Sequence, residues 1–491
     1  MEVQFRDTAV EFLRTVIQET KNQEQTQEVK LSDAMPDIGR ILTAWGQPVI
    51  RSKQWNGDGM SASGGVMAWV MYAPEDGTDP RCVETWIPFQ FRWDFSQTQR
   101  DGIMRMDCRV CGMDARSLSA RKLMVRAQIS CRGEAYEAAK EIVTIPETIP
   151  DDIQLLKQSY PVTMPEEAGE KTFSIDEEEE LPADRKDAHK LLRYHLRPEL
   201  TEKKIMGDKV VFRGCVLGHA LLADPDGGLK SWDFEIPFSQ FAQLDKEYGP
   251  ESLADVVMAV TNLEMELTEN GSLRIKAGLV GQYLIYNRTV IEAVLDAYSP
   301  LRNVRQEIKI LQFPVLLDWV NQTLTAEKSY DMPEDMPVDL SFSLMHPEMN
   351  REGDRWAMDL NGHFQLLTDR PEAVAVKWET ELDVSAGGDT KLWADAWVSG
   401  TPKISGQELR CDAYISMKFT GQTQIPSVCA LDLGEIRTPD PERPSLVLRR
   451  AGEDRLWDMA KENGTTVEAI CAANGLTEEP DPERFLLIPI P

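Results

Sequence analysis

The amino-acid sequence predicts a mainly β protein, with three tandem antiparallel β-sandwich-like repeats followed by a small β-α-α-β domain. Three observations predict this class. Pairs of apolar strands recur on either side of turn sequences, and a strictly alternating apolar segment recurs at a similar spacing. The end of the chain then combines two short strand patterns with two short helical ones.

The recurring strand pairs occupy equivalent places in three blocks of the chain. They lie at residues 65–72 with 86–89, 214–222 with 235–238, and 360–367 with 378–382. The turns between them, at 74–77, 224–227 and 369–372, are rich in Asp, Pro, Glu and Gly, which favour turns. Ile87 and Ile236 are 149 residues apart, and Ile236 and Leu382 are 146 apart.

Two further markers repeat with the strand pairs. In residues 123–129, 273–279 and 409–415 the first, third, fifth and seventh side chains are apolar, the period of a half-buried strand. An acidic residue shortly before Met-Pro or Leu-Pro occurs at 33–36, 180–182 and 331–333. We therefore expect two-faced antiparallel sheets in each block.

These spacings set the predicted domain boundaries. Repeats are expected at 1–150, 151–300 and 301–437, a stiff Pro-rich linker at 438–444, and the small domain at 445–491. We expect short helices at Thr8–Glu19, Glu134–Ile142 and Ile291–Ala297. The acidic segment from Asp151 to Asp184 is predicted to be a partly mobile connector.

The C-terminal 47 residues are predicted to fold as β-α-α-β. Residues 446–448 form the first strand, Asp454 caps the first helix, and Gly464 ends it. The buried stripe of this helix is Leu456, Met459 and Ala460.

The second helix of this domain has its own start and stop signals. Thr465 and Glu468 form a capping box, and 474–476 end the helix. Its inner face is Val467, Ile470 and Cys471, and residues 485–489 form the closing strand.

This segment resembles a LysM domain in its element order and in Asp454, 456–457, 460–461, 465–467, 474–476 and 488–489. The resemblance implies binding of N-acetylglucosamine-containing glycans through the loop before the first helix and the loop after the second. We predict that partner or glycan contacts come from Asp454, Arg455, Leu456, Trp457, Asn474, Glu478 and Glu479. The carboxylates crowded in these loops favour a basic protein surface over a neutral sugar.

The whole chain resembles the SPOCS-domain (DUF3794) proteins of spore-forming Firmicutes that end in a LysM domain. The resemblance implies a non-enzymatic scaffold of the spore coat, located in the mother-cell cytoplasm at the forespore surface. Its partners would be stage IV sporulation protein A, the ATPase polymer of the coat basement layer, and other coat proteins. The alternative is a peptidoglycan- or N-acetylglucosamine-binding protein of the envelope or cortex.

The net charge and the targeting signals indicate which classes of partner and which cell compartment to expect. The chain has 53 basic and 82 acidic residues, a net charge of −29, which argues against nucleic acid and anionic membranes as partners. We find no signal peptide and no apolar run of membrane-spanning length. The eight cysteines are therefore expected to stay reduced.

The sequence motifs that could support catalysis, metal binding or cofactor binding are weak, so we expect no catalytic residue, metal or cofactor. Cys108 and Cys111 form a C-x-x-C without a second pair, and fall on opposite faces of a predicted strand. The scattered histidines, His189, His195, His219, His346 and His363, favour packing or surface roles. Residues 57–62 fit G-x-G-x-x-A in a hairpin context, and 224–227 are a turn.

The tryptophans are interpreted mainly as core residues. Large rings at strand positions fill sandwich cores, which applies to Trp69, Trp86, Trp232 and Trp378. For Trp457 two interpretations stay open, core packing and a place beside the ligand groove.

Overall fold

The computed structural model describes residues 3–97, 101–330, 337–352, 355–368, 372–382, 390–438 and 443–490. Most of this structure is strand, so the predicted mainly β class is confirmed. Besides the strands, the described residues form a short 3-10 helix, Ala183–Arg185, and two α-helices near the C-terminus. For convenience, residues 3–150, 151–300 and 301–438 are called segments 1, 2 and 3, and residues 443–490 the C-terminal unit.

The strands follow one another with short connections. Segment 1 contains β1 (Gln4–Lys30), β2 (Ile38–Asn56), β3 (Gly59–Pro74), β4 (Arg81–Asp94), β5 (Ile103–Ser119) and β6 (Lys122–Thr148). Segment 2 contains β7 (Gln154–Glu180), β8 (Lys190–Ala223), β9 (Leu229–Tyr248), β10 (Leu253–Leu267) and β11 (Ser272–Tyr298). Segment 3 contains β12 (Arg302–Ser329), β13 (Asp339–Leu344), β14 (Glu348–Glu352), β15 (Arg355–Leu367), β16 (Glu372–Leu382), β17 (Lys391–Ser405) and β18 (Glu408–Ile436).

Three of the sheets have the same construction, with one long strand between two antiparallel neighbours. Their strand orders are β1-β6-β5, β7-β11-β10 and β12-β18-β17. The remaining strands form β2-β3-β4, β8-β9, and β13-β15-β14 with β16 on β15. The three predicted strand pairs are confirmed, because Val66 pairs with Ile87, Val216 with Ile236, and Leu360 with Trp378.

The central strands carry the predicted alternation into the core. All twelve apolar positions of the three alternating segments are at most 3% exposed: Leu123, Val125, Ala127, Ile129, Leu273, Ile275, Ala277, Leu279, Leu409, Cys411, Ala413 and Ile415. Trp69 is also fully buried, whereas Trp86, Trp232 and Trp378 are partly buried against the cores. The hairpin loop predicted at 57–62 is shorter in the structure, because only residues 57–58 lie between β2 and β3, and 59–62 belong to β3. The turn predicted at 224–227 joins β8 to β9.

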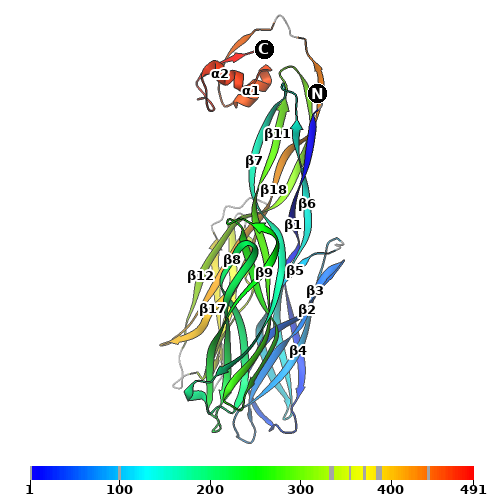
Figure 1. Ribbon diagram of the computed structural model, residues 1–491. Coiled ribbons are helices and arrows are strands. Elements are labelled where there is room, and N and C mark those ends of the chain that lie inside the picture. The colour runs from blue at the N-terminus through cyan, green and yellow to red at the C-terminus, as the bar shows by residue number, and fades with distance from the viewer. Residues whose placement is uncertain are drawn as a thin grey trace.

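A stalk rises from the body formed by these sheets (Figure 1). In the three sheets of the same construction, β5, β10 and β17 start their pairing with the central strand at Tyr136, Tyr286 and Thr420. Beyond these residues, the two-stranded ribbons β1/β6, β7/β11 and β12/β18 continue together. About 12 further residues per strand at roughly 3.3 Å each give a stalk of about 40 Å.

The stalk has an apolar centre to which all three ribbons contribute. It contains Phe12, Val143, Val162, Met164, Ile291, Ala293, Leu311, Phe313 and Ile425, each at most 7% exposed. The rings of Phe12 and Phe313 meet edge to face at 5.7 Å. A two-stranded ribbon is marginal in water, so mutual burial along this centre stabilises the stalk.

The three predicted helices are wrong, because their residues are stalk strands. Thr8–Glu19 pairs with 133–143, with one register shift between Thr15 and Ile17, and this partner strand includes the second predicted helix. Ile291–Ala297 pairs with 155–160 of β7. Long-range pairing and burial between ribbons override the helix-forming composition of these segments.

The predicted mobile connector is also wrong. Most of it, Gln154–Glu180, is strand β7, paired with β11 along its whole length. Its acidic run 176–180 lies opposite residues that include Arg274 and Lys276, which offset the negative charge. The marker at 331–333 and most of the linker at 438–444 lie outside the described residues.

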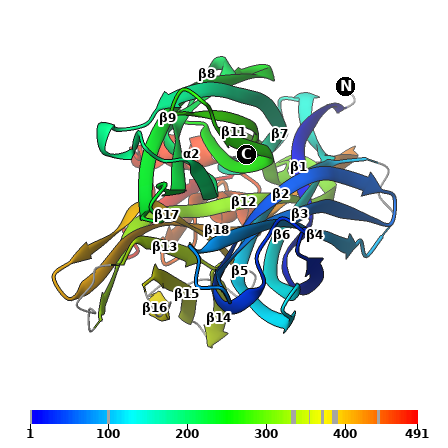
Figure 2. The ribbon, with the colours of Figure 1, turned by 90° about the horizontal axis from the view of Figure 1, so that it is seen from below.

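Residues about one segment length apart meet where the three segments join. Arg105 pairs with Asp255, 150 residues later, and Arg193 with Asp339, 146 residues later. Gln47 donates to the Leu196 carbonyl at 2.8 Å, 149 residues later. Seen from below, the three segments surround a common centre (Figure 2). Such contacts arise when similar units surround an axis and equivalent positions meet on it.

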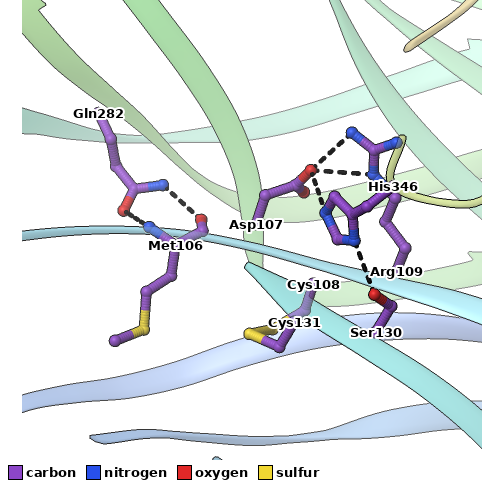
Figure 3. The surroundings of a disulfide bond; sticks show 8 residues. All are labelled: Met106, Asp107, Cys108, Arg109, Ser130, Cys131, Gln282 and His346. Carbon is purple, nitrogen blue, oxygen red and sulfur yellow. Dashed lines mark hydrogen bonds and ion pairs between the residues drawn. A yellow bond between two sulfur atoms is a disulfide. The ribbon is translucent and has the colours of Figure 1, made fainter. Parts of the chain in front are cut away.

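Cys108 and Cys131 form a disulfide between β5 and β6, which corrects the expectation that all eight cysteines stay reduced (Figure 3). The two residues face each other directly in the antiparallel ladder, with Cα atoms 4.2 Å apart. A directly opposed pair in such a ladder has side chains close enough to bond. The sequence did not reveal this partner, because β5 and β6 pair across a turn that the C-x-x-C spacing does not include.

Two histidines belong to buried polar clusters rather than to packing alone, which corrects that interpretation. His346 Nδ1 lies 2.8 Å from Ser130 Oγ, and His346 Nε2 lies 3.1 Å from Asp107 Oδ2. Figure 3 shows both contacts. Burial lowers the pKa of His346 to about 3, so its ring is neutral at pH 7.

His219 belongs to a second cluster and has the opposite charge state. Burial opposes its charge, but Asp339 at 2.9 Å and Asp233 at 2.7 Å raise its pKa to about 9. It is therefore a cation at pH 7, held between a buried and a half-exposed carboxylate.

Candidate interaction surface of the C-terminal unit

The C-terminal unit consists of β19 (Leu446–Arg450), α1 (Leu456–Asn463), α2 (Val467–Asn474) and β20 (Phe485–Pro489). Both helices end at glycines in the left-handed conformation, Gly464 with φ 58° and Gly475 with φ 63°. The core contains the predicted Leu456, Met459, Ala460 and Ile470, each at most 4% exposed. The β-α-α-β order predicted for this part of the chain is confirmed.

The predicted helix caps differ from those observed. The first helical amide, on Leu456, donates to the Glu479 carboxylate at 3.0 Å, while Asp454 instead contacts Arg449. Glu479 therefore joins the loop after α2 to the start of α1, where a carboxylate also favours the helix dipole. At α2 the cap is Thr466, whose hydroxyl accepts from the Ala469 amide at 3.1 Å.

One predicted contact residue, Trp457, anchors the unit to the stalk. Its Nε1 donates to Asp296 at 2.8 Å, and its ring meets that of Tyr298 edge to face at 4.8 Å. Lys461 donates to both carboxylate oxygens of Asp296 at 2.7 Å. The Tyr298 hydroxyl donates to the Thr465 carbonyl at 2.9 Å. Core packing is thus the interpretation of Trp457 that the structure supports.

The electrostatics of this joint suit a permanent contact. Burial opposes the charge of Asp296, but hydrogen bonds from Lys461 and Trp457 outweigh it and lower the pKa of this carboxyl. Burial raises the pKa of Tyr298 to about 12, so its hydroxyl stays a donor. These contacts hold the unit at the far end of the stalk, as Figure 1 shows.

The remaining predicted contact residues divide into structural and exposed ones. The Asn474 side chain exchanges hydrogen bonds with the Leu487 backbone at 2.6 and 2.8 Å, which fixes α2 to β20. Leu456 is 4% exposed and belongs to the core. Asp454, Arg455, Glu478 and Glu479 are exposed on the two loops.

A feature that sequence reasoning missed is an apolar outer face on the two-stranded sheet. Leu446, Leu448, Phe485 and Leu487 are 51%, 64%, 62% and 39% exposed. Leu448 lies opposite Leu487, and the pairing register puts all four on one side of the sheet. Residues 446 and 448 alternate with 447 and 449 along the strand, so one side of the strand does not face the core. This alternation was the signal in the sequence for an exposed face. We call these four residues the apolar face.

Charged residues border the apolar face. The Arg450–Glu483 ion pair lies at one edge, since Arg450 is opposite Phe485 in the ladder. The two loops of the unit carry further exposed carboxylates, Glu453, Asp454, Glu478, Glu479 and Asp481. Asp454 contacts Arg449, which the register puts on the side of the sheet opposite to the apolar face. Residues 445–491 hold five basic and nine acidic residues, a net charge of −4. This combination suits an apolar protein surface bordered by basic residues.

Groups for catalysis or metal binding do not gather at this surface. Residues 445–491 contain no histidine, and its cysteine, Cys471, is partly buried against the core. Throughout the described ranges, no group of three or more His, Cys, Asp and Glu side chains is arranged to hold a metal ion.

Comparison with known proteins does not identify a family for this chain, so the proposed function depends on its own residues. The chain matches no family model, no curated protein and no solved structure. In the part of the chain that the structure describes, no helix has the length and apolar character needed to cross a membrane.

Proposed function

We propose that this chain is a non-enzymatic assembly scaffold, in which three SPOCS-like repeats carry a LysM-like unit that binds another protein. The exposed apolar face, on a unit with a net charge of −4, is the observation that supports the proposal most. Contact with a partner would remove these four large apolar side chains from water and lower the free energy, by about 1.5–3 kcal/mol for each side chain that passes from fully exposed to fully buried.

The partner inferred from this chemistry is a protein surface with an apolar groove and basic rims. In the context that the resemblance implies, that partner is stage IV sporulation protein A, and the scaffold would join the coat to the forespore surface. Binding to a polymer would also allow many copies to act together, which raises the overall affinity beyond that of one contact.

A glycan is the alternative ligand, and the contacts of Trp457 and Glu479 argue against it. The indole packs on Tyr298, and the Glu479 carboxylate occupies the amide at the start of α1. Both groups are thus engaged within the protein, and the two loops that would hold a sugar are already connected.

The test compares Leu448→Glu with Leu118→Glu, an exposed leucine on β5 that is 43% exposed. Purified full chains are titrated with the purified ATPase. Leu448→Glu should weaken binding at least about tenfold, since it removes apolar contact and adds a charge that needs solvation. Leu118→Glu should bind like the wild type.

Equal affinities of the two variants would remove the apolar face from the interface. No binding of the ATPase by the wild type, together with saturable heat on adding chito-oligosaccharide, would support the glycan alternative instead.

A further inference from the structure

The small sheet of the C-terminal unit has two outer edges, one on β19 and one on β20. Among the described residues each of these strands pairs only with the other, so one side of each is an outer edge. Such an edge presents a row of backbone N–H and C=O groups to which another strand can pair. The two edges differ in whether these groups are already bonded within the chain.

The outer edge of β20 is closed by the chain itself. The Asn474 side-chain amide donates to the Leu487 carbonyl at 2.6 Å and accepts from the Leu487 N–H at 2.8 Å. Two residues later, Pro489 has no N–H to donate. A further strand therefore finds neither free groups at Leu487 nor a donor at Pro489.

The outer edge of β19 is open. Leu448 lies directly opposite Leu487, whose backbone groups point away from β19, so the backbone groups of Leu448 point away from β20. Leu446 and Arg450, two residues to either side, have the same orientation. Within the described ranges, no hydrogen bond reaches the backbone N–H or C=O of these three β19 residues. We call these groups the free edge.

Hydrogen bonds at the two ends of the ladder confirm this orientation. The Ala451 N–H donates to the Arg484 carbonyl at 2.8 Å, and the Ile490 N–H donates to the Ser445 carbonyl at 3.0 Å. Odd-numbered residues of β19 therefore face β20, and the even-numbered residues between them face outward.

The free edge and the apolar face share residues. Leu446 and Leu448 contribute to both, through their backbone and their side chains respectively. A strand that pairs antiparallel with β19 places the side chains directly opposite these leucines on the same side of the sheet. It would extend the apolar face while its backbone satisfies the free edge. The contacts of the unit with the stalk come from Trp457, Lys461 and Thr465 rather than from β19.

Charge favours a different protein over a second copy of the chain as the source of that strand. The chain has a net charge of −29, and residues 445–491 contribute −4. Two copies would therefore repel each other, whereas a strand flanked by basic residues would be attracted.

We propose that the free edge of β19 accepts an extended segment of a partner protein as a third, antiparallel strand. This segment has apolar residues at alternate positions and basic residues beside them. The inference rests on the protein-binding role proposed above and specifies how the partner binds. Backbone hydrogen bonds supply affinity in such added strands, and the alternate side chains supply specificity.

The test compares Arg450→Pro with Arg450→Ala in purified full chains titrated with the ATPase. Both variants lose the exposed ion pair with Glu483, which contributes little. Only proline also removes an outward N–H, and it leaves the ladder with β20 and the apolar side chains in place. Arg450→Pro should weaken binding at least about tenfold, and Arg450→Ala about twofold at most. The melting temperature of each variant checks its folding.

Amide hydrogen exchange of the wild-type chain, resolved to single residues, is the second measurement. In the free chain the amides of Leu446, Leu448 and Arg450 should exchange rapidly. The complex should slow all three at least about tenfold, because each N–H gains an acceptor.

The outcomes separate this inference from the proposed function. If Leu448→Glu weakens binding but the two Arg450 variants bind equally and the edge amides stay unprotected, the added strand is overturned and the protein-binding role stands. No binding of the ATPase by the wild type would overturn both. Dimers of the free chain that Arg450→Pro dissociates would assign the edge to a second copy and also overturn the proposal.

Discussion

Asp255 offers the most direct test of how the body is held together. Its carboxylate is 1% exposed and receives Arg105 of segment 1 at 2.8 Å and Lys418 of segment 3 at 2.5 Å. Burial opposes its charge, but these cations outweigh burial and hold the pKa of Asp255 well below its ordinary value. Asp255→Asn keeps the shape and removes the charge that both cations share.

The expected cost follows from leaving buried cations without their partner. Arg105 retains Glu134 at 3.3 Å, whereas Lys418 loses its short ion pair. Removing one partner of a buried pair costs about 3–5 kcal/mol. If the roughly 430 residues of body and stalk unfold together, the unfolding entropy is about 0.9 kcal/mol/K, and the melting temperature should fall by about 4 °C.

Differential scanning calorimetry distinguishes this outcome from independent segments. If each segment unfolded alone, the same cost on about 150 residues would lower one transition by about 13 °C and leave two unchanged. The control is Asp58→Asn, whose carboxylate is 69% exposed beside Arg92 and should matter little. Equal melting of the two variants, or a single large shift in one of three transitions, would refute a shared buried centre.

Two more predictions follow from the other buried charges. The folded pKa of His219, about 9, exceeds the unfolded value of 6.5, so its stabilisation is complete below pH 6.5 and is lost as pH rises through 9. The wild-type melting temperature should therefore fall more between pH 6.5 and 9.5 than that of His219→Gln; equal slopes would contradict this. Asp296→Asn removes the charge that binds Lys461 and Trp457, so amide exchange in α1 should be about tenfold faster. The exposed Asp458→Asn should exchange like the wild type, and equal rates in both variants would exclude a role for Asp296 in docking.

Local alternation explains why the body could be predicted from the sequence. A half-buried strand records its core in every second residue, as in Leu123, Val125 and Ala127, and this signal needs no knowledge of the partner strand. Turn residues between two such strands indicated that the strands pair with each other. The strand pairs were therefore recognisable wherever both strands were close in the sequence.

The stalk could not be predicted, because its stabilising contacts are distant. Residues 134–142 contain three alanines, three glutamates and a lysine, a composition typical of helices, yet their ladder partners lie about 120 residues earlier, in β1. The buried side chains of the stalk face other ribbons rather than one continuous core. A single-sequence pattern does not contain either relationship.

The C-terminal surface shows the same limit on a smaller scale. Its glycine stops were predictable, since a left-handed residue after a helix favours glycine. The caps were not, because Glu479 accepts from the Leu456 amide from 23 residues away, while Asp454 contacts Arg449. Trp457 was ambiguous for the same reason: its partner Asp296 lies 161 residues earlier.

The topology also bears on how the proposed scaffold would carry load. The C-terminal unit follows β18, the central strand of its sheet, which pairs with β12 along nearly its full length and with β17 in the body. A pull on the unit would therefore act along β18 and load all these ladder hydrogen bonds together, in shear, rather than one at a time. The contacts of Asp296 and Tyr298 add a second connection to β11, so part of the same pull would enter segment 2 directly. Because segments 2 and 3 share the buried centre at Asp255, the load would then spread through the whole body, as a tether between two assemblies requires.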